Sequence, residues 1–415
     1  MARWLYWLLL AVPLALLAHF LNWSEIVVFI ASAIGLIPLA GLIGQATEEL
    51  AEHVGPLVGG LLNATFGNAP ELIIGIAALN AGLLDVVRAS ITGSIIGNTL
   101  LVLGTALLVG GWRNGRQYFD ARNAGQYASM LALAVVGLVL PALANTFGFS
   151  STGGQPGTHH VNIDAVSIAF SVILLISYIA YLAYTVFHVR DRVRPAPEDE
   201  REGDVPAPEE DGPPLVPPSA ALAEEQQQEL AQEAAAQVKS PASTPLAANA
   251  KPAAAETSAR KRVAMQELWR PVVVLAAATV ATAIVSELLV GAIEPVTAQF
   301  GWSQIFVGLI IVPIVGNAAE HSSAIQMALK DRVDVSMAIT AGSSIQVALL
   351  VAPVLVLVSF PLGQTLDLLF KPLELVIFGL ATFLFPLISL DGESTWLEGL
   401  LLLSFYLMVG VIAFF

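Results

Sequence analysis

The 415-residue chain contains no cysteine, and only 12% of its residues are charged. Without cysteine it cannot form a disulfide, a thiolate metal site, an iron–sulfur cluster or a cysteine nucleophile. Basic residues are also scarce, 18 against 33 acidic ones, and they form no patch that would bind nucleic acid. Apolar residues make up 56% of the chain, in long runs that a soluble protein of this length could not bury. We therefore expect an all-α, polytopic integral membrane protein.

Apolar runs between turn and charge signals predict eleven membrane spans. The predicted spans are 4–20, 25–44, 47–79, 85–110, 125–146, 163–189, 269–292, 303–329, 334–360, 372–390 and 396–415. The first span follows a single positive charge, Arg3, and no A-x-A cleavage pattern comes after it. These features favour a retained helix over a signal peptide.

The spans group into four predicted segments. They are an N-terminal transmembrane helix (1–22), a first five-helix repeat (23–189), a polar linker (190–265) and a second five-helix repeat (266–415). The linker is rich in proline, alanine, glutamate and glutamine and poor in aromatic residues, so it is predicted to be disordered. A simple tether between the two halves is the favoured interpretation, and a regulatory or partner-binding loop is the alternative.

The positions of the basic residues predict the orientation in the membrane. With the amino terminus and the linker in the cytoplasm, only Arg88 and Lys371 of the 18 basic residues fall outside. We expect the chain to lie in a bacterial inner membrane, surrounded by bilayer lipid. A homo-oligomer is left open.

One short pattern, G-N-A-x-E, occurs twice, at 67–71 and at 316–320, with an offset of 249 residues. The same offset relates four further pairs, which are Gly59 and Gly308, Asp85 and Asp334, Gly93 and Gly342, and Ser94 and Ser343. A fixed offset over this span indicates an internal duplication. Five spans are an odd number, so the second repeat must cross the membrane in the opposite sense to the first. Such inverted repeats place their substrate near the bilayer midplane.

Each repeat places a glutamate, Glu71 or Glu320, in the middle of a membrane-length helix. An ionisable residue at this depth is costly, and it is a functional-site hypothesis by default. Asn68 and Asn317 precede the glutamates by three residues and therefore share their helix face. Residues that interrupt helices flank both motifs, namely Gly67, Pro70, Pro313 and Gly316. Interruption frees backbone carbonyls, which is tolerated at membrane depth only where they line a cavity or bind something.

The next span of each repeat adds polar side chains that are expected to line a pathway, namely Ser94, Asn98, Ser343, Ser344 and Gln346. Helix packing is an equal alternative for Ser94 and Asn98. A site made of oxygen atoms suits a hard cation such as Ca²⁺. The expected cation ligands are Glu71, Glu320, Asn68 and Asn317. Protons compete for the same carboxylates, and competition at one alternating site is sufficient for antiport.

Four further titratable residues are possible modulators of this site. Glu48, Glu49 and Glu52 open the third predicted span. The favoured interpretation is that they are acids stabilised at a helix start, and the alternative is that they form a cytoplasmic cation funnel. His321 follows the second glutamate directly, and it either pairs with Glu320 or faces a neighbouring helix.

The motifs resemble those of the cation/proton exchangers in the calcium/cation antiporter superfamily. Residues 59–73 (GGLLNATFGNAPELI) are similar to the first family repeat, 312–321 (VPIVGNAAEH) to the second, and 342–346 (GSSIQ) to the motif after it. This resemblance implies eleven helices, a linker after the sixth, and export of cytosolic Ca²⁺ in exchange for protons. It also implies that Glu71 and Glu320 carry Ca²⁺ and protons alternately, in a pathway lined by Asn68, Asn317, Ser94, Ser343, Ser344 and Gln346.

The chain departs from the family pattern at two points, because Pro70 replaces the usual threonine and the linker is unusually long. A sodium/calcium exchanger of the same superfamily is one alternative, which His321 and the GSSIQ motif disfavour. A membrane-embedded hydrolase is another, disfavoured because no span contains an HExxH, GxSxG or DxD-type pattern. A passive channel would not require titratable acids in both halves. We expect a transporter, not an enzyme, with no cofactor and with Mn²⁺ or Na⁺ as alternative cargo to Ca²⁺.

Overall fold

The computed structural model describes residues 5–54, 56–146, 163–187 and 253–415. One compact unit contains Met1–Val189 and Met265–Phe415. The other unit, Arg190–Ala264, is described only from Ala253 onward, where it is helical. Most of the linker predicted to be disordered therefore lies outside the described residues.

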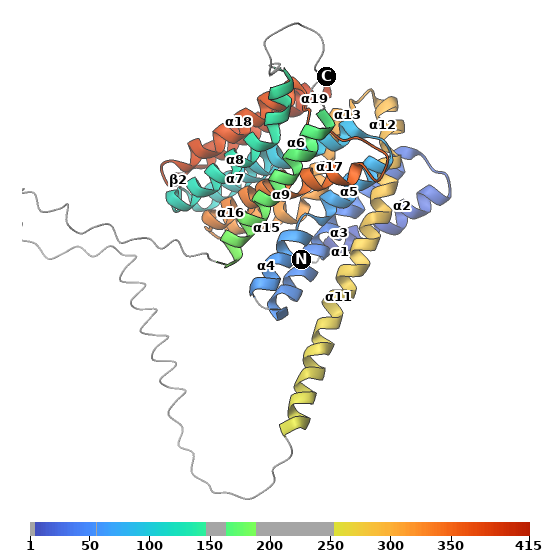
Figure 1. Ribbon diagram of the computed structural model, residues 1–415, viewed down its shortest axis with the longest axis vertical. Coiled ribbons are helices and arrows are strands. Elements are labelled where there is room, and N and C mark those ends of the chain that lie inside the picture. Colours follow the sequence, from blue (N-terminus) through green and yellow to red (C-terminus); the bar gives the residue numbers. More distant parts are fainter. Residues whose placement is uncertain (1–4, 55, 147–162, 188–252) are drawn as a thin grey trace, which may run out of the picture. The chain divides into compact units, whose positions relative to one another are not determined.

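The described residues are almost entirely helical (Figure 1). Before the linker, the elements are α1 (Leu5–Leu8), α2 (Ala11–Phe20), α3 (Glu25–Val54), α4 (Pro56–Phe66), α5 (Ala69–Asn80), α6 (Leu84–Ile96), the π-helical turn η1 (Gly97–Val102), α7 (Leu103–Asn114), β1 (Gln117–Tyr118), α8 (Ala121–Thr146) and α9 (Ile163–Phe187).

After the linker, the elements follow a related order. They are α11 (Ala253–Gly291), α12 (Ile293–Phe300), α13 (Gln304–Phe306), the π-helical turn η3 (Val307–Ile311), α14 (Val312–Gly316), α15 (Ala318–Leu329), α16 (Val333–Gln346), the π-helical turn η4 (Val347–Val351), α17 (Ala352–Ser359), α18 (Pro372–Ser389), β2 (Glu393–Ser394) and α19 (Trp396–Phe414). The two strands pair antiparallel, with Gln117 opposite Ser394.

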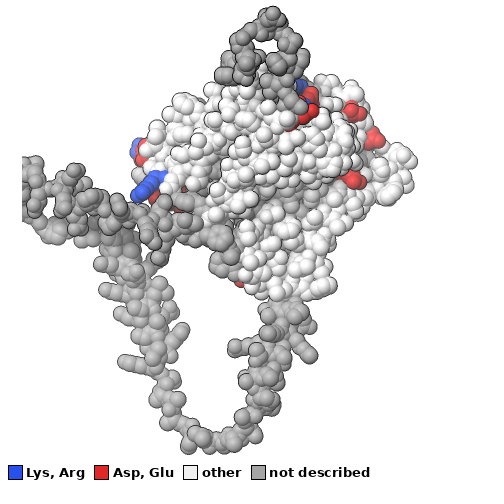
Figure 2. All heavy atoms as spheres, viewed as in Figure 1, with Lys and Arg blue, Asp and Glu red and all other residues white. Residues whose placement is uncertain are grey.

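The helices have the length and composition of membrane spans. Eight described helices are long and apolar enough to cross a bilayer, and the bent pair Gln304–Gly316 and Ala318–Leu329 makes a ninth. Two apolar helices, Tyr6–Phe20 and Ala69–Asn80, are shorter. On the face in Figure 2, charged side chains of the described part lie at its margins, and a broad surface between them carries no charge. The polytopic all-α membrane fold is confirmed, whereas the count of eleven spans stays a prediction.

Two boundaries differ from those predicted, and some elements were not predicted at all. Helix α3 continues through Gly44 to Val54, because Gln45, Ala46 and Thr47 do not break a helix. Helix α11 begins at Ala253, inside the predicted linker, where alanine and arginine are strong helix formers. The short helix α12 and the strand pair were not predicted.

The two halves interlock. Helix α19 packs along α7, α6 packs on η3, and α18, α17 and α16 pack on α8 and α9. Glycines allow the closest of these contacts. A methyl group added to Gly399 would lie 2.2 Å from the backbone nitrogen of Leu108, and one added to Gly308 would lie 2.6 Å from the carbonyl oxygen of Val86. Small residues serve this purpose between membrane helices. The contact between α6 and η3 positions the candidate site.

Candidate functional site: two glutamates at paired helix breaks

The duplicated motif coincides with a duplicated break in the helices. Helices α4 and α5 are separated at Gly67–Asn68, and α14 and α15 are separated at Asn317. Asn68 has φ −100° and ψ 17°, and Asn317 has φ −90° and ψ 18°, so the backbone leaves the helix in the same way twice. At the second break the helix axis bends by 63°. Proline and glycine are the usual causes of such breaks, and both motifs contain them.

Each break places a glutamate in the first turn of the helix that follows. Glu71 lies in the first turn of α5, and Glu320 in the first turn of α15. The free N–H groups and the positive end of the helix dipole favour a carboxylate at this position. Glu71 is buried and Glu320 is half-buried. The sequence pattern alone thus specified where each acid stands relative to its break.

The two breaks face each other across the interface of the halves. A methyl group added to Gly316, at the second break, would lie 3.4 Å from Cγ of Glu71. The carboxyl groups of Glu71 and Glu320 are close enough to interact electrostatically. Helix α3 passes beside the second break, where a methyl group added to Gly44 would lie 3.9 Å from Cβ of Ala319.

Three asparagines form hydrogen bonds from one half of the chain to the other. Nδ2 of Asn317 donates to Oγ of Ser94 at 3.2 Å. Nδ2 of Asn98 donates to Oγ of Ser343 at 2.9 Å. Nδ2 of Asn68 likewise donates to Oε1 of Gln346. In each bond the asparagine Nδ2 is the donor, so the amide oxygen Oδ1 takes no part in the bond.

The amide oxygens join a set of buried oxygens without hydrogen-bond partners. Within the described residues, this set includes Oδ1 of Asn68, Asn98 and Asn317, both carboxylate oxygens of Glu71 and Oε2 of Glu320. Burying a polar atom without a partner costs free energy, so a site that keeps several of them is suited to a ligand that they can bind. The six atoms named are all oxygens, which fits a hard cation as cargo.

Two of the three π-helical turns in the described residues, η1 and η4, strengthen the equivalence of the halves. η1 interrupts the helix that carries Ser94 and Asn98, and η4 begins directly after Gln346. With the offset of 249 residues, the two turns fall on the same part of the repeat. Single π-helical turns are rare and occur frequently at functional sites. No composition signal in the sequence indicated them.

Comparisons with known proteins identify the family of this chain. The family model described as sodium/calcium exchanger protein matches residues 24–187 and 270–415. The chain belongs to this exchanger family. It is similar to a Ca²⁺/H⁺ antiporter of Synechocystis sp. (38% identical, covering 98% of this chain and 96% of the relative) and to one of Aphanothece halophytica (37%, 98% and 95%). The Ca²⁺/H⁺ antiporter ChaA of Bacillus subtilis is 36% identical, covering 96% and 95%.

Solved structures agree with the family. This exchanger-family chain matches native YfkE with a TM-score of 0.71 and 33% identity, covering 99% of both chains. The H⁺/Ca²⁺ exchanger CAX has a TM-score of 0.64 at 14% identity, covering 99% of this chain and 90% of that one, which shows a common fold alone. The expected family is confirmed, and the chain is a transporter, not a hydrolase.

The predicted modulators are not all where the sequence suggested. In this exchanger-family chain Glu48, Glu49 and Glu52 lie in the last turns of α3, so their interpretation as acids at a helix start is wrong. The physical reason is the continuous helix through Gly44. His321 is half-buried in α15, and its Nε2 has no hydrogen-bond partner among the described residues.

Ser344 is the site candidate whose hydroxyl is already satisfied by main-chain atoms. Its Oγ donates to the carbonyl oxygen of Thr340 at 2.9 Å and lies 3.4 Å from that of Ile95. Ile95 and Ser344 are equivalent under the offset of 249 residues, so this contact joins a position to its own duplicate. The structure places Ser344 at the packing contact between α6 and α16.

Sequence reasoning missed a run of polar residues directly after the second glutamate, which the first repeat lacks. After Glu320, helix α15 continues with His321, exposed Ser322 and exposed Ser323, whereas after Glu71 helix α5 continues with Leu72, Ile73 and Ile74. On the neighbouring helix α3, Nε2 of Gln45 donates to Oε1 of Glu49 at 3.3 Å. Comparing the two repeats position by position would have revealed this difference.

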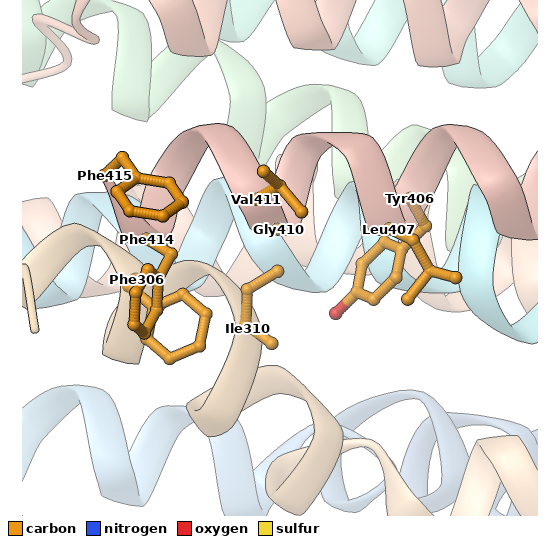
Figure 3. Close-up of a pocket in the computed structure, with 8 residues that line it drawn as sticks. All are labelled: Phe306, Ile310, Tyr406, Leu407, Gly410, Val411, Phe414 and Phe415. Carbon is orange, nitrogen blue, oxygen red and sulfur yellow. The ribbon is translucent and has the colours of Figure 1, made fainter.

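An apolar cavity lies apart from these residues (Figure 3). It has a volume of about 310 Å³, and its lining includes neither glutamate. The lining residues come from α13, η3, α19 and the end of the chain, namely Phe306, Ile310, Tyr406, Leu407, Gly410, Val411, Phe414 and Phe415. Tyr406 is the one lining residue with a polar side-chain group. A hard cation needs several oxygen ligands, so this cavity is unsuited to one.

Proposed function

We propose that this protein is a Ca²⁺/H⁺ antiporter that exports Ca²⁺ from the cytoplasm in exchange for protons. Three relatives that are 36–38% identical over nearly the whole chain carry the name Ca²⁺/H⁺ antiporter. The observation that supports a common mechanism is the pair of glutamates at equivalent helix breaks, each beside buried oxygens without partners. The proposed site for both ions consists of Glu71 and Glu320.

The number and kind of oxygens suit Ca²⁺. Calcium takes about six to eight oxygen ligands in flexible geometry. Six unpartnered oxygens come from Glu71, Glu320 and the three asparagines Asn68, Asn98 and Asn317. The described residues hold no group of three acidic, histidine or cysteine side chains placed to hold a metal ion. Amide and hydroxyl groups would therefore complete a site that has only two negative charges, which balance one divalent cation.

The coupling to protons follows from electrostatics. Two carboxyl groups held close together in a low-dielectric environment repel each other when both are charged. A divalent cation relieves this repulsion, and so do protons. Either the cation or the protons therefore occupy the carboxylates, and charge balance requires at least two protons for each Ca²⁺.

The duplication supports alternating access to a shared central site. Inverted repeats place the substrate site at their interface near the midplane. The basic residues favour an orientation in which Lys330 is cytoplasmic and Arg88 is extracytoplasmic, in a bacterial inner membrane. The polar residues 321–323 of α15 then lie on the cytoplasmic side of Glu320. Glu48, Glu49 and Glu52 become candidates for attracting cations on that side.

Coupling to sodium is the second candidate, because the matching family model is described as a sodium/calcium exchanger. Purified protein in liposomes, with the membrane potential clamped, separates the two. Uptake of radioactive Ca²⁺ is measured under an imposed pH gradient and, separately, under an imposed Na⁺ gradient. Proton antiport predicts uptake with the first gradient only, abolished by a protonophore. Uptake with the Na⁺ gradient alone would reject the proposal. Mn²⁺ added as a competitor tests cation selectivity.

A further inference from the structure

The apolar cavity of Figure 3 lies between α19 and the segment formed by α13 and η3, and contacts at one end fix these walls against each other. Oγ of Ser303 donates to the carbonyl oxygen of Ala413 at 2.7 Å. The rings of Phe306 and Phe414 meet edge-on, with their centroids 5.3 Å apart. The volume of about 310 Å³ lies within the range of small-molecule sites.

One hydroxyl group in this lining has no partner. Tyr406 is only 3% exposed, and its Oη forms no hydrogen bond within the described residues. Figure 3 shows the tyrosine ring reaching from α19 towards η3, with the hydroxyl pointing to the side of Ile310. Burying a hydroxyl without a partner costs free energy, and a buried tyrosine usually has one. The cavity therefore offers a single hydrogen-bond donor to a ligand.

This hydroxyl lies far from both ends of its helix. Helix α19, Trp396–Phe414, has the length and composition of a membrane span. Tyr406 is about 15 Å along the helix from Trp396 and about 12 Å from Phe414, at 1.5 Å per residue. The hydrocarbon core holds no water that could satisfy a polar group at this depth. The partner of Tyr406 must therefore be a molecule that dissolves in lipid.

The cavity borders the lipid-facing side of α19. Leu407 and Val411 both line it, and both are exposed. They are four residues apart and therefore lie on the same face of the helix. A ligand that enters between them comes from the bilayer without crossing water. The lining residues carry no charge, so this ligand must be neutral.

Depth and charge together select the class of ligand. An acyl chain would fill the volume but has no acceptor for the hydroxyl, because the ester groups of a lipid stay in the interfacial region. The carboxylate of a fatty acid would place a charge in hydrocarbon, which is costly. A quinone carries neutral carbonyl oxygens on an apolar ring. Such a ring also suits the aromatic side chains of the lining, which are Phe306, Phe414 and Phe415.

We propose that this cavity binds a membrane quinone, whose ring carbonyl accepts a hydrogen bond from Oη of Tyr406. The ring packs against Phe306 and Phe414, and the apolar tail leaves between Leu407 and Val411 into the lipid. The site shares no residue with the proposed cation site, so binding does not depend on the proposed function. Its η3 wall continues through α14 to the second helix break, so a bound ring contacts the helix that leads to Glu320.

Photolabelling with benzophenone tests the inference. Benzophenone is a neutral ketone with apolar rings, and on irradiation it forms a covalent bond to a nearby C–H group. Full-length protein in liposomes is irradiated without any ion gradient, and the labelled peptides are identified by mass spectrometry. Decylubiquinone and dodecane are compared as competitors at equal membrane concentrations. We expect saturable labelling of residues 306–310 and 406–415, displaced by decylubiquinone and not by dodecane.

Two variants separate the hydroxyl from the space. Tyr406→Phe keeps the ring and removes the donor, so decylubiquinone should compete about five- to tenfold more weakly, as the loss of one hydrogen bond predicts. Gly410→Leu places a larger side chain in the cavity, where even an added methyl group would lie 3.6 Å from Cδ1 of Ile310, and should abolish the labelling.

Each variant has a matched control elsewhere in the chain. Tyr118→Phe changes an exposed tyrosine of β1, and Gly379→Leu adds the same side chain to α18, where an added methyl group would meet nothing within 4 Å among the described residues. Both controls should label and compete as the unchanged protein does. The readout is binding, so a failure of Ca²⁺/H⁺ exchange would be detected separately.

Three results would overturn the inference. Displacement by dodecane as effective as that by decylubiquinone would show a cavity that accepts any acyl chain. Labelling that does not saturate and spreads over all lipid-facing helices would show benzophenone dissolved in the bilayer alone. Unchanged competition by decylubiquinone in folded Tyr406→Phe protein would show that the hydroxyl takes no part in binding.

Discussion

Gly93 is the residue whose substitution most directly tests the packing that positions the site. It lies on α6 at the contact with η3. A methyl group added there would lie 2.2 Å from the carbonyl oxygen of Leu309 and 2.5 Å from Cγ of Pro313. Ordinary contact begins near 3.4 Å, so the two backbones must separate by about 1.2 Å to accept Gly93→Ala.

The consequence is worked out from the neighbouring hydrogen bond. Oγ of Ser94 accepts from Nδ2 of Asn317 at 3.2 Å. A separation of this size would stretch that bond beyond hydrogen-bonding distance. Overpacking of this kind costs about 1–3 kcal/mol of stability. A displacement of about 1 Å in a functional site can cost a factor of about 100. We therefore expect the apparent affinity for Ca²⁺ to fall at least tenfold.

The assay compares Gly93→Ala with Gly379→Ala in thermal unfolding and in proton-driven Ca²⁺ uptake. Gly379 lies in α18, where an added methyl group would meet nothing within 4 Å among the described residues. The control should be neutral or slightly stabilising, because alanine favours a helix. Gly93→Ala protein with unchanged stability and unchanged Ca²⁺ affinity would refute the close contact and the positioning argument built on it.

Three further predictions concern the site, the topology and the linker. Gln346→Leu removes the acceptor for Asn68, frees its amide to rotate, and should lower Ca²⁺ affinity several-fold without changing the proton dependence; a change in coupling alone would contradict this role. Cysteines introduced at Asn80 and at Lys330 should be labelled from opposite sides of the membrane, and labelling from one side would disprove the inverted repeat. Deleting residues 195–252 should leave transport per folded molecule largely intact, so that a folded but inactive deletion would show the linker to be more than a tether.

The sequence was informative where local chemistry decides the backbone. Glycine and proline around Asn68 and Asn317 predicted two helix breaks, and the spacing of the motif placed Glu71 and Glu320 directly after them. The family resemblance rested on the same residues, and it was confirmed. Whether these residues carry Ca²⁺ and protons stays a prediction.

Features that depend on the other half of the chain could not be predicted. The bond between Asn98 and Ser343 joins residues 245 positions apart, and its existence depends on how the helices that carry them pack.

The continuation of α3 through Gly44 was missed for a local reason. A single glycine in an apolar run is equally compatible with a helix break and with a continuous helix. The ion pair between Arg88 and Asp367 could not be predicted either, because the two residues stand far apart in sequence.

The central claim is that Glu71 and Glu320 each bind both the cation and the proton. Glutamine at either position keeps the shape but removes the charge and the titratable proton. Aspartate keeps the charge but withdraws it by one methylene, about 1.5 Å. If these glutamates only packed or satisfied neighbours, glutamine would be the milder change. Glu294→Gln, which alters an exposed glutamate in the first turn of α12, is the matched control.

The deciding measurement is proton-driven Ca²⁺ uptake into liposomes after a pH jump, for both substitutions at Glu71 and at Glu320. Our account predicts that each glutamine variant loses coupled exchange, while each aspartate variant binds Ca²⁺ more weakly and keeps some proton dependence. The control should transport normally. Robust proton-driven uptake by either folded glutamine variant would contradict the account for that residue.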